Sequence, residues 1–165
     1  MTNFTRVFTM FVSTILTIQI SAAENTLFTP EDVFDLEYAS DPRVSPDGRS
    51  VVYVRRSNDI MTDKTRSSLW QVDAQGNNHR PLVSDTNNYS SPRWSADGTR
   101  LAYISSASGS TQVHVRWLDT GQTALLTNLR NSPKHISWSP DGRRIAFTMS
   151  VKGKTRILAK ARKKP

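Results

Sequence analysis

The sequence predicts an all-β fold built from repeated four-stranded units, and three observations carry that prediction. A similar ten-residue stretch occurs three times, as VSPDGRSVVY from Val44, WSADGTRLAY from Trp94 and WSPDGRRIAF from Trp138. The copies are regularly spaced, with 50 residues from Gly48 to Gly98 and 44 from Gly98 to Gly142. A second theme, SLWQVDAQGNNHRPLV and later QVHVRWLDTGQTALLT, lies between the copies. Internal repeats with a period of this length are typical of repeat folds.

Each ten-residue copy is predicted to be a β-hairpin. A proline, Pro46 or Pro140, fixes φ before the turn in the first and third copies, and Ala96 stands there in the second. In all three copies the aspartate bonds the turn backbone, and the glycine adopts the positive φ that closes the turn. A short β-branched or aromatic run follows each turn. We therefore assign a structural role in the repeat turns, not a chemical one, to Asp47, Gly48, Asp97, Gly98, Asp141 and Gly142.

Two hairpins per repeat give four strands in about 45 residues, which is the length of a β-propeller blade. The predicted blades span about 40–85, 86–130 and 131–149, the last being partial, and the segment RRSNDIMTDKTRSS is expected to be a longer connection within the first blade. About two and a half blades are too few to close a propeller, which needs four to eight. The tryptophans at matched positions, Trp94 and Trp138, are predicted to pack between blades, and Trp70 and Trp117 to lie in the core.

The region before the repeats has two predicted parts. Residues 1–23 have the basic start, short apolar run and small Ser21 and Ala23 of a cleaved signal peptide, which indicates export, most simply to a bacterial periplasm. An uncleaved membrane anchor is the alternative, although the apolar run of about fourteen residues is short for a bilayer span. Residues 24–39 form an N-terminal extension with one helix of about two turns, in which Thr29 is the N-cap and Pro30 the first helical residue.

The net charge of +8 comes from the end of the chain. The last fourteen residues contain seven lysines and arginines and no acid, and the rest has 15 basic and 14 acidic residues. We interpret residues 150–165 as a solvated basic tail, and we expect no nucleic-acid partner because the tail has no aromatic residues for stacking. A basic tail that binds nucleic acid or anionic lipid is the alternative.

At this point the residues resemble a known family. The stretch FTPEDVFDLEYASDPRVSPDGRSVVYV, after a signal peptide, is similar to the start of bacterial serine peptidases of the prolyl oligopeptidase family (S9), in their dipeptidyl-peptidase and acylaminoacyl-peptidase branches. In these enzymes a propeller with WD40-like PD40 repeats precedes an α/β-hydrolase domain and restricts access to short peptides. The W-S-P-D-G motif alone is less specific, because periplasmic TolB-type propellers share it.

The resemblance does not extend to catalytic residues. The family's nucleophile lies in a G-x-S-x-G turn, and no two glycines of this chain are four residues apart. The chain is therefore expected to come from a truncated or fragmentary reading frame and to be inactive alone. Short peptides are the expected substrates, and a missing α/β-hydrolase domain would cleave them. A TolB-like module that binds envelope proteins is the alternative. In the dipeptidyl-peptidase branch, charged propeller residues bind the substrate, but the match does not place Glu37, Arg55 or Arg56 in that role.

No cofactor or metal site is predicted. The absence of cysteine excludes zinc knuckles and thiol nucleophiles. His79, His114 and His135 have no metal-binding spacing, and the Asp-Gly pairs lack the clustered carboxylates of a calcium loop. Solvated or structural histidines and ordinary turns are the favoured interpretations.

Overall fold

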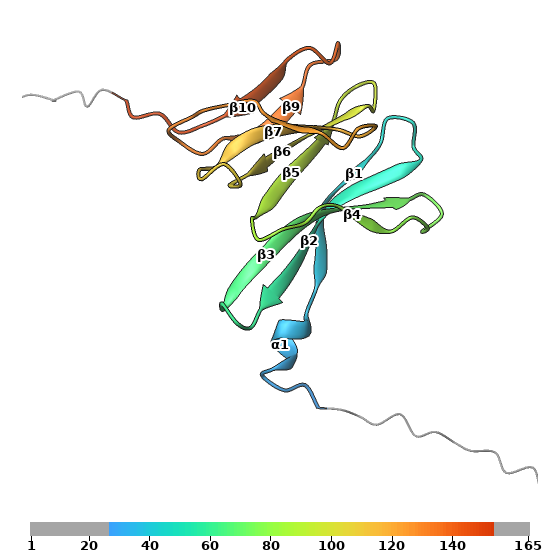
Figure 1. Cartoon of the computed structure of the whole chain (residues 1–165), viewed down its shortest axis with the longest axis vertical. Helices are drawn as coiled ribbons and strands as arrows, with labels where there is room; N and C mark the ends of the chain where they lie inside the picture. The colour runs from blue at the N-terminus through green and yellow to red at the C-terminus, as the bar shows by residue number, and fades with distance from the viewer. Residues whose placement is uncertain (1–26, 154–165) are drawn as a thin grey trace, which may run out of the picture.

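The computed structural model describes residues 27–153, and these form three antiparallel sheets after one short helix (Figure 1). The first sheet contains β1 (Tyr38–Val44), β2 (Ser50–Asp59), β3 (Lys64–Asp73) and β4 (Arg80–Val83), and the second contains β5 (Tyr89–Trp94), β6 (Arg100–Ser105), β7 (Gln112–Trp117) and β8 (Thr123–Leu125). β9 (Lys134–Trp138) and β10 (Ile145–Thr148) form a third, two-stranded sheet. Within each sheet the strands lie in chain order. The predicted all-β architecture of four-stranded units is confirmed, with the third unit incomplete in the described residues.

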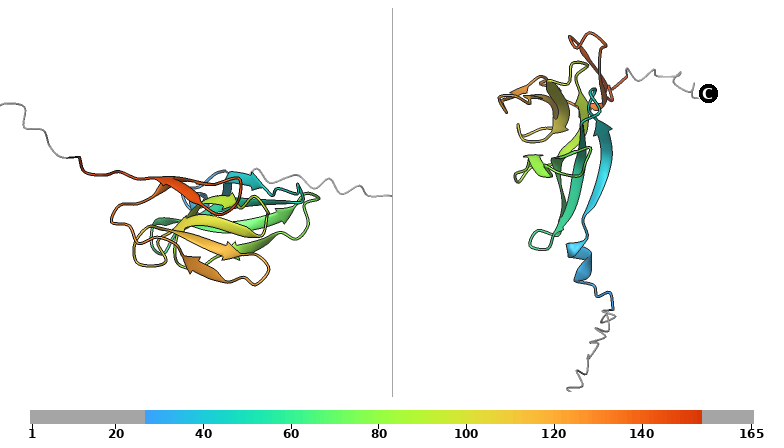
Figure 2. Two further views of the ribbon diagram at one scale, coloured as in Figure 1. Left: turned by 90° about the horizontal axis from the view of Figure 1, so that it is seen from above. Right: turned by 90° about the vertical axis from the view of Figure 1, so that its right-hand side faces the viewer.

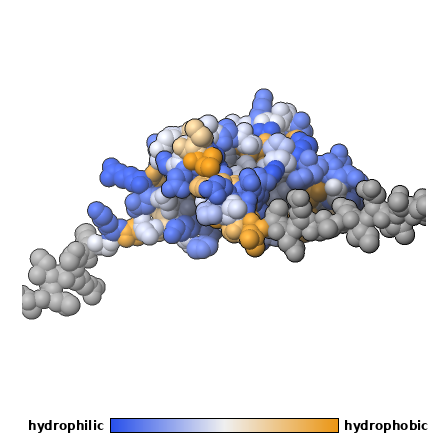
Figure 3. Space-filling model, turned by 90° about the horizontal axis from the view of Figure 1, so that it is seen from below, coloured by the Kyte–Doolittle hydropathy of each residue, from blue (hydrophilic) through white to orange (hydrophobic). Residues whose placement is uncertain are grey.

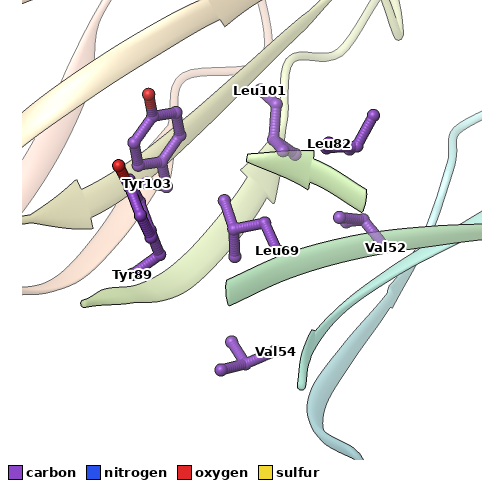
Figure 4. Packing of buried hydrophobic residues seen from close by; sticks show 7 residues of the cluster. All are labelled: Val52, Val54, Leu69, Leu82, Tyr89, Leu101 and Tyr103. Carbon is purple, nitrogen blue, oxygen red and sulfur yellow. The ribbon is translucent and has the colours of Figure 1, made fainter. Parts of the chain in front are cut away.

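The hairpins within each sheet form where the sequence alternates between apolar and polar residues. Val52, Val54 and Leu69 are buried on the face of the first sheet that points toward the second sheet. Their partners from the second sheet include Leu101 and Tyr103 (Figure 4). Alternate residues of a strand lie on opposite faces of the sheet. The second sheet has apolar residues at both sets of positions, and both of its faces are buried. Its other set, which includes Ala102, Ile104 and Val113, packs against the third sheet.

The three sheets follow one another in space in chain order, with the second between the other two (Figures 1 and 2). The first strands of neighbouring sheets, β1 with β5 and β5 with β9, contact each other directly. In a propeller the blades surround a central channel. The contacts of β5 with both β1 and β9 favour the side of these first strands as the inner one.

The segment RRSNDIMTDKTRSS differs from the prediction of a connecting loop. Arg55 pairs with Ser68 and the ladder continues to Asp59 paired with Lys64, so that most of the segment is strand and the turn is confined to residues 60–63. The polar composition of residues 55–59 and 64–68 does not show the apolar alternation of a strand. These two strand ends are held by pairing with each other. Arg66 Nε donates a 2.7 Å hydrogen bond to the Asp59 carboxylate across the hairpin.

The predicted helix is present, but its start and its length were wrong. α1 (Asp32–Asp35) is a single turn whose N-cap is Glu31, and the Thr29 N–H donates a 2.6 Å hydrogen bond to the Asp32 carboxylate instead of Thr29 capping the helix. Most helical stability in proteins comes from packing of an apolar face. No residue of α1 is buried, and Val33 and Leu36 are exposed. The helix therefore ends after one turn.

The predicted signal peptide and most of the predicted basic tail lie outside the described residues. Within residues 27–153, the one helix is far too short to cross a lipid bilayer.

Candidate functional site

The turn residues predicted from the sequence form one arrangement that recurs three times. Ser45, Ser95 and Ser139 each donate a hydrogen bond of 2.5–2.6 Å to the aspartate two residues later. The same serine oxygens accept from the backbone N–H of Ser50, Arg100 and Arg144, at 2.9 Å in each case. The glycines after the aspartates have φ of 71°, 70° and 65°, a left-handed conformation that favours glycine.

These hydrogen bonds also set the charge state of the turns. The serine hydroxyl and the backbone N–H bonds stabilise the ionised carboxylate. They lower the pKa of Asp47 and Asp141, and they lower the pKa of Asp97 to about 2. Each carboxylate accepts hydrogen bonds from its own turn, so these aspartates have a structural role.

The matched tryptophans join neighbouring sheets. The Trp94 indole N–H donates to the Arg43 carbonyl on β1 at 2.9 Å, and the Trp138 indole N–H donates to the Arg93 carbonyl on β5 at 3.0 Å. The first unit has Val44 at this position, and its side chain is 63% exposed. Each indole therefore connects its own first strand to the first strand of the preceding sheet.

The other two tryptophans are less buried than predicted. Trp117 is 38% exposed at the end of β7, so the prediction of a core position was wrong. It lines an open groove between the second and third sheets. Trp70 is partly buried, and the Arg55 guanidinium lies 4.3 Å from its ring centroid.

The first strands carry a second recurring feature, which sequence reasoning missed. Asp41, Ser91 and His135 each lie three residues before the Val44, Trp94 or Trp138 position. All three have a left-handed backbone, with φ of 48°, 54° and 49°. The ladders of β1 and β5 shift register beside Asp41 and Ser91, as expected for a β-bulge. A left-handed backbone is uncommon for non-glycine residues. Its occurrence at the same position of all three repeats shows that this backbone conformation is part of the repeat.

Charged groups gather at these bulges. The Asp41 carboxylate accepts from Arg43 at 2.6 Å and from Arg93 of the neighbouring sheet at 2.8 Å. All three side chains are partly exposed, and together they carry one excess positive charge. We call the surface formed by Asp41, Arg43, Ser91, Arg93 and His135 the inner-strand surface. Exposed guanidinium groups of this kind can donate hydrogen bonds to a carboxylate or a carbonyl oxygen.

The charged residues considered in the sequence lie apart from this surface. Arg55 forms an ion pair with Glu37 and lies on the face of the first sheet that points away from the second sheet. On the same face, the Tyr53 hydroxyl and His79 Nε2 share a hydrogen bond. The Arg56 side chain donates to Ser40 Oγ at 3.3 Å. The structure therefore does not bring Glu37, Arg55 and Arg56 together in one site.

The three histidines are also separate. His79 packs against Trp70, His135 Nδ1 lies 3.0 Å from the Thr148 hydroxyl, and His114 is buried against Tyr103. Burial lowers the pKa of His114, so its ring is neutral in the core at pH 7. No cluster of three potential metal ligands occurs within residues 27–153.

Comparison with known proteins places these features in a family. The PD40 family, described as TolB beta propeller domain, matches residues 51–163. Dipeptidyl-peptidase 5 of Porphyromonas gingivalis is 32% identical over 113 residues, which are 66% of this chain and 16% of that protein. The Tol-Pal system protein TolB of Methylobacillus flagellatus is 32% identical over 85 residues, 52% of this chain and 20% of that protein.

A solved structure supports the fold. The acylaminoacyl peptidase of Pyrococcus horikoshii matches with a TM-score of 0.58 at 23% identity, over 69% of this chain and 17% of that one. The chain thus spans a fifth or less of the length of each of these three relatives. The resemblance to S9 peptidase propellers is confirmed, and TolB proteins match as well.

Proposed function

Because this chain belongs to the PD40 family of TolB-type β-propeller domains, we propose that it is the propeller portion of an exported S9-type serine exopeptidase. The observation that carries the proposal is the match to dipeptidyl-peptidase 5, which covers 113 residues at 32% identity. In this proposal the complete protein hydrolyses short peptides, as a dipeptidyl or acylaminoacyl peptidase. The propeller contributes by limiting which substrates reach the catalytic domain.

The proposed gating rests on the geometry of the inner strands. The first strand of the second sheet, β5, contacts the first strands of both neighbouring sheets, and a closed ring of such sheets would surround a channel. In this proposal, the channel admits an extended or short peptide and excludes a folded protein. Arg43 and Arg93, which share Asp41, are partly exposed on this side and can donate to peptide carbonyl or carboxylate oxygens.

Peptide hydrolysis requires catalytic residues, and this sequence does not contain the motif in which the family carries its nucleophile. Acyl transfer by a serine peptidase needs an activated serine, its base and an oxyanion hole. The sequence has no G-x-S-x-G elbow. We propose that an α/β-hydrolase domain encoded downstream supplies all three, and that this chain alone has no peptidase activity.

The test of the proposal has two parts. Sequencing the reading frame beyond the codon for Pro165 is expected to reveal further W-S-P-D-G repeats followed by G-x-S-x-G. The purified chain is expected to release no product from dipeptidyl or acyl-aminoacyl chromogenic substrates, while the complete protein releases it in a serine-inhibitor-sensitive reaction. Serine-dependent turnover by this chain alone would disprove the proposed division of labour.

A second candidate function is a protein-binding module of the TolB kind, and the matches to several TolB proteins favour it. In that case the partner would be an envelope protein and no catalytic domain would be needed. A pull-down from an envelope extract that gives one stoichiometric protein partner supports this function. The inner-strand surface offers a test variant. Arg93→Ala should weaken binding of a partner that enters the channel.

We also propose that the protein acts outside the cytoplasm, in the periplasm. The support is the signal-like pattern of residues 1–23. Fractionation of cells that express the chain, with N-terminal sequencing of the mature form, tests it. The expected mature protein begins at Glu24.

A further inference from the structure

A pocket opens between the first and second sheets, beside their Asp-Gly turns. It has a volume of about 520 Å³, which is within the range of small-molecule binding sites. Asp47 and Ser50 line it from the first sheet, and Trp94 and Gly98 line it from the second. The same place in the repeat occurs again between the second and third sheets, so the two junctions can be compared group by group.

At the second junction an arginine side chain of the protein occupies this place. The Arg100 guanidinium carbon lies 5.0 Å from the centroid of the Trp138 ring, and Arg100 Nη2 donates to the Gly142 carbonyl at 3.1 Å. The same nitrogen lies 3.5 Å from the carboxylate of Asp97. Arg100 therefore contacts the carboxylate of its own turn, and the indole and the turn carbonyl of the next sheet.

The first junction has the same three groups without the arginine. Asp47, Trp94 and Gly98 are the repeat counterparts of those groups, and all of them line the pocket. Ser50 stands where the second sheet has Arg100. Within residues 27–153, no cation lies over the Trp94 ring, the Gly98 carbonyl accepts no hydrogen bond, and Asp47 forms no ion pair. The groups that hold a guanidinium at one junction are thus present and free at the other.

Two further residues make the wall of this pocket polar. Gln71 on β3 and Arg80 on β4 line it and pair with each other, where the matching pair of the second sheet is Val115 and Ala124. The Arg80 side chain makes no hydrogen bond or ion pair with the part of the chain that the structure describes. Such a guanidinium group can donate two parallel hydrogen bonds to a carboxylate.

We propose that this pocket binds arginine that has a free carboxylate, either the amino acid itself or the C-terminal residue of a short peptide. The ligand's guanidinium stacks on the Trp94 ring and donates to the Asp47 carboxylate and the Gly98 carbonyl, as Arg100 does at the second junction. The ligand's carboxylate accepts from Arg80. No residue of the inner-strand surface lines the pocket, so the inference does not depend on the proposed function.

The charges of the pocket favour this ligand over a neutral or purely cationic one. The Ser45 hydroxyl and the Arg49 N–H lower the pKa of Asp47, so its carboxylate is charged at neutral pH. An indole ring attracts a cation placed over its face, and a planar guanidinium can stack and donate at the same time. Arg80 would repel a ligand that carries only positive charge. A carboxylate on the ligand removes that repulsion.

Equilibrium dialysis of the full chain against radiolabelled L-arginine tests the proposal, because bound ligand is measured whatever the association state of the protein. Saturable binding with a Kd below about 1 mM is expected. Citrulline has no positive charge on its side chain and agmatine has no carboxylate, so each should compete at least about tenfold less well than unlabelled arginine. Absence of saturable binding, or equal competition by citrulline, would overturn the proposal.

The tripeptide Gly-Gly-Arg distinguishes the two sources of the ligand. Competition by this tripeptide as strong as that by arginine identifies the C-terminal residue of a peptide as the ligand. Competition by the amino acid alone identifies free arginine.

The variant Ser50→Arg supplies the guanidinium from the chain itself. It should reduce arginine binding at least about tenfold and raise the unfolding temperature by about 4 °C, since the new side chain makes the contacts of Arg100. The matched control is Ser108→Arg, the same substitution in the exposed turn between β6 and β7, away from the pocket. The control should bind arginine like the unmodified chain. Undiminished binding by Ser50→Arg would contradict the assignment of the site.

A second variant remains informative if Ser50→Arg does not fold. Arg80→Gln keeps a polar side chain but removes the partner of the ligand's carboxylate. Its affinity for L-arginine should fall to that for agmatine, and its affinity for agmatine should not fall. If the variant still prefers arginine, or loses both ligands equally, Arg80 does not bind the carboxylate and the proposed ligand is wrong.

Discussion

The serine hydroxyl before each Asp-Gly turn makes two hydrogen bonds that hold the turn together. Ser95 donates to the Asp97 carboxylate and accepts from the Arg100 N–H across the hairpin. The carboxylate also accepts from the Thr99 N–H at 3.1 Å. The same contacts that close the turn stabilise the charged form of the aspartate, so folding and ionisation are linked.

The first prediction follows from this linkage. The pKa of Asp97 is lowered to about 2 in the folded chain from its ordinary value of 3.8. The contribution of Asp97 to stability is therefore present above about pH 4 and is lost as the pH falls toward 2. We expect the urea midpoint of Asp97→Asn to fall less steeply than that of the unmodified chain between pH 4 and pH 2.

The control for this experiment is Asp35→Asn. The Asp35 carboxylate makes no hydrogen bond to the described residues and lies on the exposed helix. Its acid-induced destabilisation should equal that of the unmodified chain. If Asp97→Asn also keeps the full pH dependence, the hydroxyl–carboxylate bond is not the cause.

The second prediction concerns the indole of Trp94. Trp94→Phe keeps most of the ring but removes the N–H that donates to the Arg43 carbonyl at 2.9 Å. Loss of one such hydrogen bond should reduce the free energy of unfolding by about 1 kcal/mol. Denaturant unfolding measures the loss.

Trp70→Phe provides the comparison for Trp94→Phe. The Trp70 indole donates to Ser68 Oγ within its own strand, at 3.0 Å, and joins no two sheets. This substitution should shift the unfolding midpoint less. A larger effect for Trp70→Phe would argue against a special role of the indole bond between sheets.

At the scale of the hairpin, the third prediction concerns Gly98. Its φ of 70° is left-handed, and a Cβ there would approach the Pro46 ring at 3.5 Å, which is ordinary contact. The cost of Gly98→Ala is therefore conformational, about 1–2 kcal/mol. Gly98→Asn should cost less, because asparagine tolerates this conformation. Thermal unfolding distinguishes the two, and an alanine variant as stable as the asparagine variant would refute the argument.

The hairpins could be predicted from the sequence because their signals are local. Proline, aspartate and glycine specify a turn within four residues, and the flanking strands alternate visibly. The long hairpin of β2 and β3 was missed at its outer end, since residues 55–59 and 64–68 are mostly polar and are held by pairing. The length of α1 was overestimated, because none of its residues is fully buried and its Val33 side chain stays exposed.

The inner-strand surface could not be predicted from the sequence for a different reason. Asp41 and Arg93 are 52 residues apart, and their contact exists only because β1 and β5 lie side by side. A signal was present in the sequence, since SDPRV and SSPRW occupy the same repeat position. That similarity indicates a repeated strand but does not show that the two arginines converge on one carboxylate.

At the scale of the whole molecule, burial is uneven among the three sheets. The second sheet is covered on both sides, whereas the first and third sheets each have a face that no described sheet covers. The surface shown in Figure 3 is largely hydrophilic, with separate hydrophobic patches. Exposed large apolar side chains include Val44, Leu125 and Leu126.

The fourth prediction follows from these uncovered faces. Expressed alone, the chain is expected to self-associate or aggregate, because exposed apolar faces and strand edges favour association. Light scattering at several concentrations measures the association. A monodisperse monomer that unfolds cooperatively would contradict the prediction.

The indole bond between sheets also has a consequence for how such a protein can grow by gene duplication. The second unit carries both halves of the joint, with the Trp94 N–H as donor toward the sheet before it and the Arg93 carbonyl as acceptor for the sheet after it. A duplicated copy of that unit would thus bring its own means of attachment on both sides. Insertion of one more blade needs no second mutation elsewhere to create the contact. Lengthening of the array by tandem copying is therefore a single genetic step.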